Sequence, residues 1–413
     1  MNTEKRKLTA DARAVAMDCL FHVFEEKQFT HLALKEAFAA HPGLSEQDRA
    51  FVTKLVEGTV ERRIQIDYVL SLYSKTKVPK LKPIIRVILR EGVYQILFLD
   101  RVPDSAAINE AVKLTKQRGF MGLSGFVNAV LRSISREKES LWEKEVPDYV
   151  KACLPEWMYD YFITLFGKEE TDRIAQYFVS PEKANYVRFQ DGHTEVMEGD
   201  IAGREDFLKG EITVQDYASQ QVSILADPKP GDEVLDVCAA PGGKACHIAK
   251  LLKGTGHVDA RDLSEGKAAL IRDNIRRLHV SNVSTTVHDA RVFDPTLVDE
   301  AGNGRMDIVL ADLPCSGLGI IGKKPDIRDH ASMEGIQSLQ KLQREILDTV
   351  VRYVKPGGKL LYSTCTLTKE EDEENRDYIL SMNKQGVFTL EKEWKLMPGK
   401  PSDGFYIAVF RRS

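Results

Sequence analysis

Two cysteines stand directly after predicted strands, where a thiol can act as a nucleophile. One lies in Asp312-Leu313-Pro314-Cys315-Ser316-Gly317, and the other lies in Ser363-Thr364-Cys365-Thr366. No histidine cluster accompanies them, so no metal is expected. A disulfide between them is the alternative, but six scattered cysteines without a C-x-x-C pair indicate free thiols in a reducing cytoplasm. The pair therefore favours thiolate chemistry.

A glycine-rich turn lies earlier in the chain, at Cys238-Ala239-Ala240-Pro241-Gly242-Gly243-Lys244. It follows an apolar run at 234–237, typical of a buried parallel strand, and precedes a predicted helix at 244–252. Asp262 ends the next predicted strand 19 residues after Gly243, near the spacing of a ribose-binding carboxylate. NAD and S-adenosylmethionine folds both place an acid there. The absence of G-x-G-x-x-G favours S-adenosylmethionine, with an ordinary structural turn as the alternative.

Methylation of a pyrimidine at C5 is a reaction that requires thiols beside a methyl donor. Amines and hydroxyls attack such a donor directly, whereas C5 of a pyrimidine is too poor a nucleophile. A thiolate that adds to C6 makes C5 enamine-like and reactive. The base must also be protonated or hydrogen-bonded at N3, a task for an acid such as Asp312. A second thiol is then able to assist expulsion of the first.

The elements that must position these residues alternate as strand and helix from residue 231 onward. Strands are predicted at 234–237, 257–262, 283–287, 306–311, 359–363 and 405–410, with a helix marked by one apolar face over 339–350. This pattern predicts an α/β fold with an open, mostly parallel, doubly wound sheet. Ligands bind at the carboxyl ends of such strands, where Asp289 follows the third strand and joins the residues named above.

Residues 1–140 are expected to form an all-helical domain of six or seven helices. Ser45 and Asp48 have the spacing of a capping box, and Pro83 is suited to open a helix that is apolar almost all round. Gly125 is expected to allow close packing of the last helix. Residues 141–225 are expected to form a linker and a small α+β module with strands at 183–190 and 211–216, and residues 226–413 the catalytic domain.

Charge is unevenly distributed along the 413 residues. Residues 1–140 hold 23 Lys/Arg and 17 Asp/Glu, whereas the remainder is net acidic. Residues 71–90 carry six basic residues and no acid, namely Lys75, Lys77, Lys80, Lys82, Arg86 and Arg90. A polyanion partner or a solvated helix end explains this equally well. No apolar run is long enough to span a membrane, and the N-terminus does not resemble a signal peptide, so a cytoplasmic protein is expected.

Several of these motifs together resemble the bacterial RNA cytosine-C5 methyltransferases of the RsmB/Fmu/Sun type. The segments that carry the likeness are 238–244, 312–317, 362–366, 212–216 with Ser219-Gln220, and Pro325-Asp326-Ile327-Arg328. Segments 90–98 and 125–132 resemble the RNA-binding helical domain of the NusB family. Gly322-Lys323-Lys324 stands where the family commonly has two arginines, and Glu370-Glu371-Asp372 where it has Glu-Glu-Asn. The last departure is expected to alter only a helix start.

The resemblance implies the roles of individual residues. S-adenosylmethionine is expected to bind at Cys238 to Lys244, Asp262, Asp289 and Asp312. Cys365 is implied as the nucleophile and Cys315 as the residue that helps release product, while Cys315 as nucleophile is the alternative. The implied substrate is a cytosine in 16S (small-subunit) rRNA, and a monomer is the default expectation.

Two rival functions remain from the sequence. An exocyclic-amine methyltransferase would require Asp/Asn-Pro-Pro-aromatic where this chain has Asp312-Leu313-Pro314-Cys315. A non-catalytic RNA-binding factor is suggested by the helical half, but both cysteines and Asp312 are intact.

Overall fold

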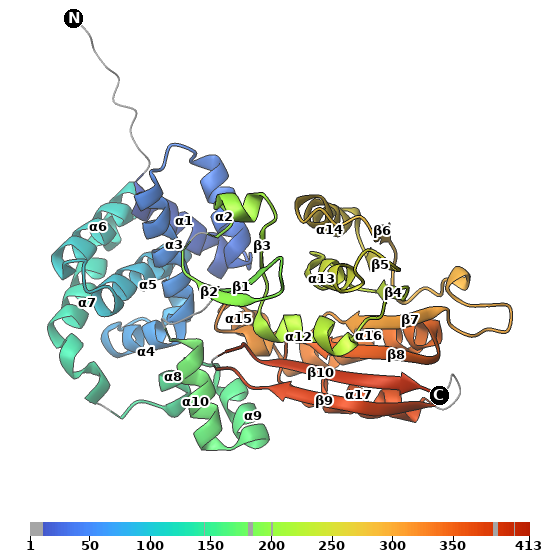
Figure 1. Ribbon diagram of the computed structural model, residues 1–413. Coiled ribbons are helices and arrows are strands. Elements are labelled where there is room, and N and C mark those ends of the chain that lie inside the picture. The colour runs from blue at the N-terminus through green and yellow to red at the C-terminus, as the bar shows by residue number, and fades with distance from the viewer. Residues whose placement is uncertain (1–10, 144, 181–184, 200, 383–386, 400) are drawn as a thin grey trace, which may run out of the picture. The chain divides into compact units, whose positions relative to one another are not determined.

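The computed structural model describes residues 11–143, 145–180, 185–199, 201–382, 387–399 and 401–413 (Figure 1). The chain divides into two compact units. The first contains Met1–Val179 together with Lys324–Asp329, and the second contains Ser180–Lys323 and His330–Ser413. No helix among the described residues is long and apolar enough to cross a membrane.

The first unit is helical throughout its described part. Its longer helices are α1 (Ala12–Glu25), α2 (Thr30–Ala40), α3 (Glu46–Glu61), α4 (Arg63–Tyr73), α5 (Pro83–Phe98), α6 (Asp104–Gln117), α7 (Ser124–Glu137), α9 (Glu156–Phe166) and α10 (Lys168–Phe178). Short turns of helix lie at η1 (Val78–Lys80), η2 (Met121–Leu123), η3 (Lys138–Glu143) and α8 (Asp148–Lys151). Seven α-helices between residues 12 and 137 confirm the expected helical organisation.

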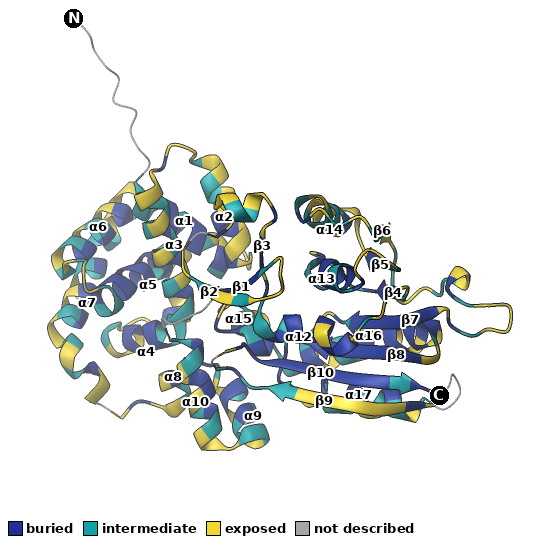
Figure 2. Ribbon diagram, in the orientation of Figure 1, coloured by how far each residue is buried: buried dark blue, intermediate teal, exposed yellow. Residues whose placement is uncertain are grey.

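Helix α5 is the centre of this unit, as its apolar sequence predicts. Pro83 is its first residue, and nearly every side chain from Ile85 to Ile96 is buried (Figure 2). Gly92 permits this packing because a Cβ there would lie 2.9 Å from a methyl carbon of Leu131 on α7. The expectation for Gly125 is wrong, since nothing lies within 4 Å of a Cβ at that position. The close approach therefore belongs to α5 rather than to the start of α7.

The segment Lys324–Asp329 is held in the first unit by buried polar contacts. Arg328 donates hydrogen bonds to the carbonyls of Val60 (2.9 Å), Glu61 and Cys153 (2.5 Å). Asp326 accepts from the backbone N–H of Thr30 at 2.7 Å, where α2 begins without a side-chain cap of its own. The helix labelled α15 (Ile327–His330) thus starts inside this unit. The Pro-Asp-Ile-Arg motif is a packing motif here.

The second unit begins with a three-stranded antiparallel sheet in the order β2-β1-β3. Its strands are β1 (Asn185–Phe189), β2 (Thr194–Met197) and β3 (Ile212–Val214), with α11 (Glu205–Leu208) and α12 (Tyr217–Ala226) alongside. The two predicted strands are confirmed, although Lys183 and Ala184 lie outside the described residues. Strand β2 was not predicted, because none of its four residues is buried and it has no apolar alternation.

The main sheet has seven strands in the order β6-β5-β4-β7-β8-β10-β9. They are β4 (Glu233–Asp236), β5 (His257–Asp262), β6 (Val283–Val287), β7 (Met306–Asp312), β8 (Val354–Thr364), β9 (Phe388–Leu396) and β10 (Phe405–Arg412). The first five are parallel, while β10 is antiparallel to both β8 and β9. The predicted mostly parallel α/β sheet is confirmed. The unpredicted β9 is an edge strand whose side chains are mainly exposed.

Helices cover both faces of this sheet (Figure 1). One core joins β4, β5 and β7 to α12, α13 (Gly243–Leu251) and α14 (Glu265–Arg277). The other joins β7 and β8 to α16 (Met333–Val350) and α17 (Glu373–Ser381). Short helices η4 (Pro295–Leu297), η5 (Leu318–Ile320) and η6 (Val351–Tyr353) complete the connections. This sandwich of strands between helices fixes the loops at the carboxyl ends of β4 to β8.

Candidate active site

The glycine-rich turn after β4 leads directly into α13. Gly242 is the N-cap residue with φ of +99°, a conformation that favours glycine, and it supplies no side-chain cap. The first N–H groups of α13 thus face the end of the sheet with the positive end of the helix dipole. The carboxylate of Asp262 is fixed one strand away, where it accepts from the N–H of Ala240 at 3.0 Å.

This arrangement suits a ligand with a ribose and a charged tail. Asp262 is almost fully buried, and its second oxygen, Oδ1, accepts from the N–H of Leu263 at 2.7 Å and lies 3.0 Å from the ammonium group of Lys267. Lys267 is itself half exposed, so ribose hydroxyls are able to displace its ammonium group from the Asp262 carboxylate. Asp289 instead pairs with Arg291, whose hydrogen bonds lower the pKa of that carboxyl. The described contacts therefore join Asp262, but not Asp289, to the glycine-rich turn.

A partly buried ion pair connects the turn to β7. The ammonium group of Lys244 lies 2.6 Å from Asp312, and the other carboxylate oxygen of Asp312 accepts from the hydroxyl of Ser363 at 2.7 Å. Burial by itself lowers the pKa of Lys244, but the carboxylate of Asp312 raises it overall. Phe405 places its ring 5.5 Å from the same ammonium group. Asp312 is thus held between a cation and a hydroxyl.

Asp236, at the end of β4, is a further acid in this cluster that the sequence did not single out. It is fully buried, and one of its carboxylate oxygens has no hydrogen-bond partner. Burial, with the nearby charge of Asp312, raises the pKa of Asp236 to about 7. Its only sequence signal is an acid that interrupts an apolar strand.

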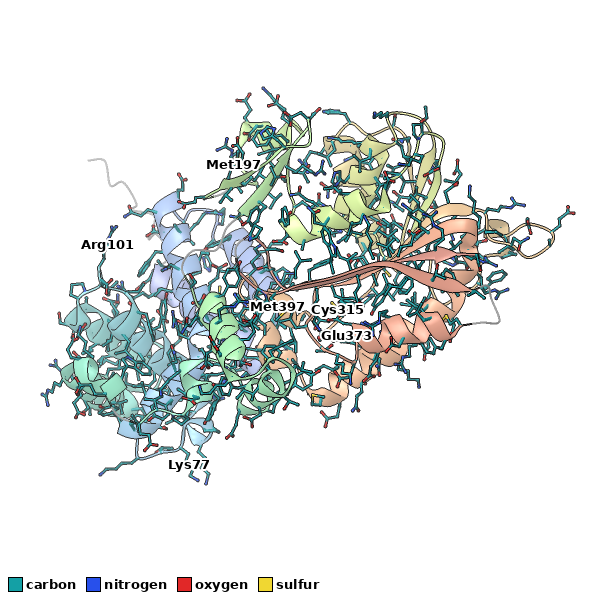
Figure 3. All side chains as sticks on the ribbon, turned by 60° about the horizontal axis from the view of Figure 1, so that its bottom comes forward. Lys77, Arg101, Met197, Cys315, Glu373 and Met397 are labelled. Carbon is teal, nitrogen blue, oxygen red and sulfur yellow. The ribbon has the colours of Figure 1, made fainter. Side chains whose placement is uncertain are left out.

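The two cysteines meet, as their positions after neighbouring strands predict. Cys315 Sγ and Cys365 Sγ lie 3.3 Å apart, and the N–H of Cys365 also points to the sulfur of Cys315 at 3.3 Å. Both residues are partly exposed as free thiols (Figure 3 labels Cys315). The hydrogen bond with Cys365, followed by burial, raises the pKa of Cys315 well above its usual value. This environment favours the protonated thiol at Cys315.

Gly319 brings the two cysteine loops together. Its N–H donates to the carbonyl of Cys365 at 3.0 Å, and its own carbonyl accepts from Gly404 at 2.9 Å. A Cβ at Gly319 would lie 2.2 Å from the carbonyl oxygen of Gly404. Only glycine fits at this crossing, so the spacing Cys-Ser-Gly-x-Gly has a steric reason.

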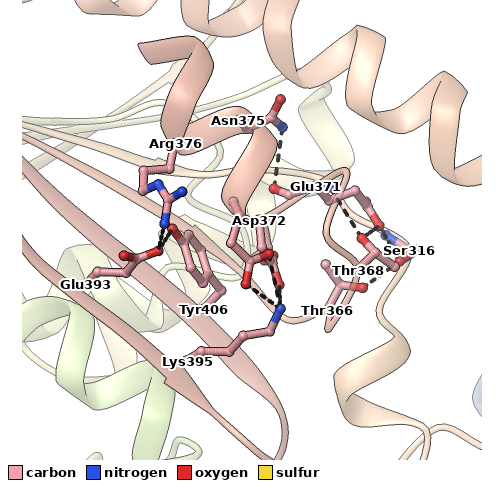
Figure 4. Close-up of polar contacts among 12 residues, drawn as sticks. Ser316, Thr366, Thr368, Glu371, Asp372, Asn375, Arg376, Glu393, Lys395 and Tyr406 are labelled. Atoms are coloured by element: carbon pink, nitrogen blue, oxygen red, sulfur yellow. Dashed lines mark hydrogen bonds and ion pairs between the residues drawn. The ribbon is translucent and has the colours of Figure 1, made fainter. Parts of the chain in front are cut away.

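The acidic stretch after Cys365 has a different role from the one expected. Asp372 stands at the start of α17 but makes no capping hydrogen bond. Instead it is fully buried, accepts from the hydroxyl of Thr364 at 2.6 Å and pairs with Lys395 at 3.2 Å (Figure 4). The departure from Glu-Glu-Asn therefore places a buried carboxyl group beside Lys395 rather than altering a helix start alone, and burial raises the pKa of Asp372 well above its usual value.

The chain is similar to known proteins over most of its length. The family described as 16S rRNA methyltransferase RsmB/F matches residues 223–411. A Bacillus subtilis protein named probable ribosomal RNA small subunit methyltransferase B is 34% identical over 392 residues, covering 88% of this chain and 86% of the relative. The chain belongs to this family of rRNA methyltransferases.

Further matches extend over both units. The NusB family matches residues 10–136, which confirms the resemblance of the helical region. The family member from Shewanella oneidensis, named ribosomal RNA small subunit methyltransferase B, is 30% identical over 434 residues and covers 96% of this chain and 98% of its own. The solved structure titled Crystal Structure of PH0851 aligns with a TM-score of 0.78 at 25% identity, covering 98% of this chain and 100% of that one.

Proposed function

We propose that this protein transfers a methyl group from S-adenosylmethionine to C5 of a cytosine in 16S rRNA, through a covalent bond between Cys365 and C6 of the base. The observation that carries the proposal is the pair of free thiols 3.3 Å apart beside the Lys244–Asp312 pair. Methyl transfer to an amine or a hydroxyl requires no thiol, whereas C5 methylation requires a nucleophile at C6.

S-adenosylmethionine supplies an electrophilic methyl group when it is bound. We assign its binding to the turn Cys238 to Lys244 with Asp262, Asp289 and Asp312. The uncapped N-terminus of α13 accommodates negative charge, and Asp262 is positioned to accept hydrogen bonds from a ribose. Cys238 takes part in this turn through its backbone and the volume of its side chain. Its thiol is unreactive, because burial raises the pKa of the side chain.

The residues of the chain then act in sequence on the base. Asp312 holds a proton at N3, and Lys244, which lies 2.6 Å from its carboxylate, is a source of that proton. The Cys365 thiolate adds to C6, and the electron pair gained by the ring makes C5 able to accept the methyl group. Once C5 carries the methyl group and S-adenosylhomocysteine is the leaving group, a water molecule accepts the C5 proton. The C6–S bond then breaks with its electron pair on sulfur, so that Cys365 leaves as a thiolate, and N3 returns its proton to Asp312. Cys315 supports that departure by donating a hydrogen bond from its thiol to the departing sulfur.

The test is methyl transfer from labelled S-adenosylmethionine into unmodified small-subunit rRNA, followed by digestion to nucleosides. We expect label in 5-methylcytidine. Label in another nucleoside would exclude the two-cysteine mechanism. No label, together with no affinity for S-adenosylmethionine, would favour a protein that only binds RNA.

Variants of the cysteines test their separate roles. Cys365→Ala should abolish transfer, whereas Cys315→Ala should accumulate a covalent protein–RNA adduct that resists denaturing electrophoresis. Cys19→Ala, at a buried cysteine of the helical unit, is the control and should retain transfer. An adduct formed by Cys365→Ala would reverse the assignment of the nucleophile.

A further inference from the structure

Glu371 is a buried carboxylate outside the residues assigned above. Its exposed fraction is 0%. It accepts hydrogen bonds from the backbone N–H of Ser316 (2.8 Å), the hydroxyl of Ser316 (2.5 Å) and the hydroxyl of Thr368 (2.8 Å) (Figure 4). It also accepts from the side-chain amide of Gln343 (3.1 Å). All four donors are neutral. A negative charge has therefore been buried among dipoles, an arrangement that is stable only when every donor is held in place.

These donors surround both cysteine loops. Ser316 follows Cys315, and its hydroxyl also lies 2.7 Å from that of Thr366, which follows Cys365. Gln343 donates from the same amide nitrogen to the carbonyl of Pro314 at 2.8 Å, on the other side of Cys315. The Cys315 loop is thus tethered at the residue before and the residue after the thiol.

We propose that Glu371 is the positioning residue that holds Cys315 and Cys365 at reacting distance, so that one thiol supports the departure of the other. This inference rests on the proposed function for its catalytic consequence, but not for its geometry. The loop from Cys315 to Gly319 has one turn of 3-10 helix and no strand pairing of its own. Without the carboxylate, Ser316 loses the acceptor for its partly buried N–H, and the loop loses its register with Thr366.

The charge of Glu371 has a second effect on the thiol pair. The pKa of Cys315 is raised first by its hydrogen bond with Cys365, next by burial, and further by the negative charges of Cys365 and Glu371. A protonated Cys315 is a hydrogen-bond donor to sulfur and a poor nucleophile. Glu371 thereby favours the division of labour in which Cys365 attacks.

The first experiment measures thiol proximity without RNA or cofactor. Diamide oxidises a close thiol pair by taking two electrons and two protons from it, and mass spectrometry of digested protein quantifies the Cys315–Cys365 disulfide. We expect Glu371→Ala to form it at least ~10-fold more slowly than the unaltered protein, and Glu371→Gln, which keeps the shape and one acceptor oxygen, within ~3-fold of it. Asp372→Asn is the matched control, because among the described contacts this adjacent, equally buried acid bonds to Thr364 and Lys395 and not to Ser316 or Gln343. The thiol pair of Asp372→Asn should oxidise at the unaltered rate.

The second experiment measures methyl transfer by the same variants. A displacement near 1 Å is able to reduce the rate about 10²-fold, so we expect Glu371→Ala to lower kcat by that order while the KM for S-adenosylmethionine stays within ~3-fold. Ser316→Ala removes the hydroxyl shared by Glu371 and Thr366, and serves if Glu371→Ala does not fold; it should slow disulfide formation ~3-fold or more.

Outcomes separate this proposal from the proposed function. Disulfide formation at the unaltered rate in Glu371→Ala or Ser316→Ala overturns the positioning role, as does equal slowing in Asp372→Asn. Slower disulfide formation supports it even if labelled 5-methylcytidine is never found, in which case only the proposed function fails.

Discussion

Replacement of Arg328 by methionine should destabilise the helical unit strongly. Arg328 is 2% exposed, and its guanidinium donates to the carbonyls of Val60, Glu61 and Cys153. Helix α3 ends at Glu61, so two of these carbonyls belong to the last turn, where the regular intrahelical hydrogen bonds stop. Besides Arg328, the Val60 carbonyl accepts only from the cap N–H of Arg62 among the described contacts. The Glu61 carbonyl accepts from the thiol of Cys153, a weak donor. The cation also lies at the negative end of the helix dipole.

The expected loss follows from these contacts. A hydrogen bond from a charged donor contributes about 1.5–3 kcal/mol, and a buried carbonyl left without a donor costs about 1–3 kcal/mol. The three bonds share one guanidinium and are not additive, so we expect a total near 3–5 kcal/mol for Arg328→Met, which preserves much of the side-chain volume.

Hydrogen exchange measured by mass spectrometry localises this effect. Exchange in peptides that contain the end of α3 should accelerate by roughly 10²–10³-fold in Arg328→Met, while the strands of the main sheet keep their protection. Arg118→Met is the control, because Arg118 pairs with Asp18 on the surface and should change stability by less than ~1 kcal/mol. Unchanged protection of α3 in Arg328→Met would refute the reasoning.

Three further predictions concern charge. Burial raises the pKa of Glu91 from its ordinary value of 4.5 to about 8. Between these two pH values the folded state keeps the proton while the unfolded chain has lost it. The free energy of unfolding should therefore fall as pH rises from about 4.5 to about 8. In urea unfolding, the free energy of unfolding of Glu91→Gln should rise relative to that of the unaltered protein across this range, by up to about 4 kcal/mol at pH 8. The same dependence on pH in both proteins would contradict the raised pKa of Glu91. Lys77 and Lys80 are exposed, and Figure 3 shows Lys77 pointing away from the helical unit. If both contact RNA phosphates, replacing both by glutamine should reduce the slope of log affinity against log salt concentration by about 1.4–1.8. An unchanged slope would exclude this contact. Asp262→Ala should weaken binding of S-adenosylmethionine by about 10–100-fold in calorimetry, and equal affinity would place the ribose elsewhere.

The sequence by itself determined the α/β sheet, the helical N-terminal region and the order of the loops that follow the strands. Apolar periodicity is a local property, and it located β4, β5, β7, β8 and the central helix α5 because those elements are largely buried. The edge strand β6 was located too, although none of its residues is buried. The same signal missed β2 and the edge strand β9, whose side chains face solvent and leave no periodic trace. Adjacency of Cys315 and Cys365 also followed from the sequence, since parallel strands end at one edge.

Tertiary structure alone decided which partners the buried polar groups have. Glu371 appears in the sequence as one acid in a charged run, yet folding places it among donors from Ser316 and Gln343, which are 55 and 28 residues away. Arg328 similarly reaches the end of α3 across 267 residues. The sequence separation between such partners follows no rule, because a buried charge is stable wherever the fold brings enough donors or acceptors to it. The sequence therefore defines the reactive groups, and the packing of distant segments defines how they are held.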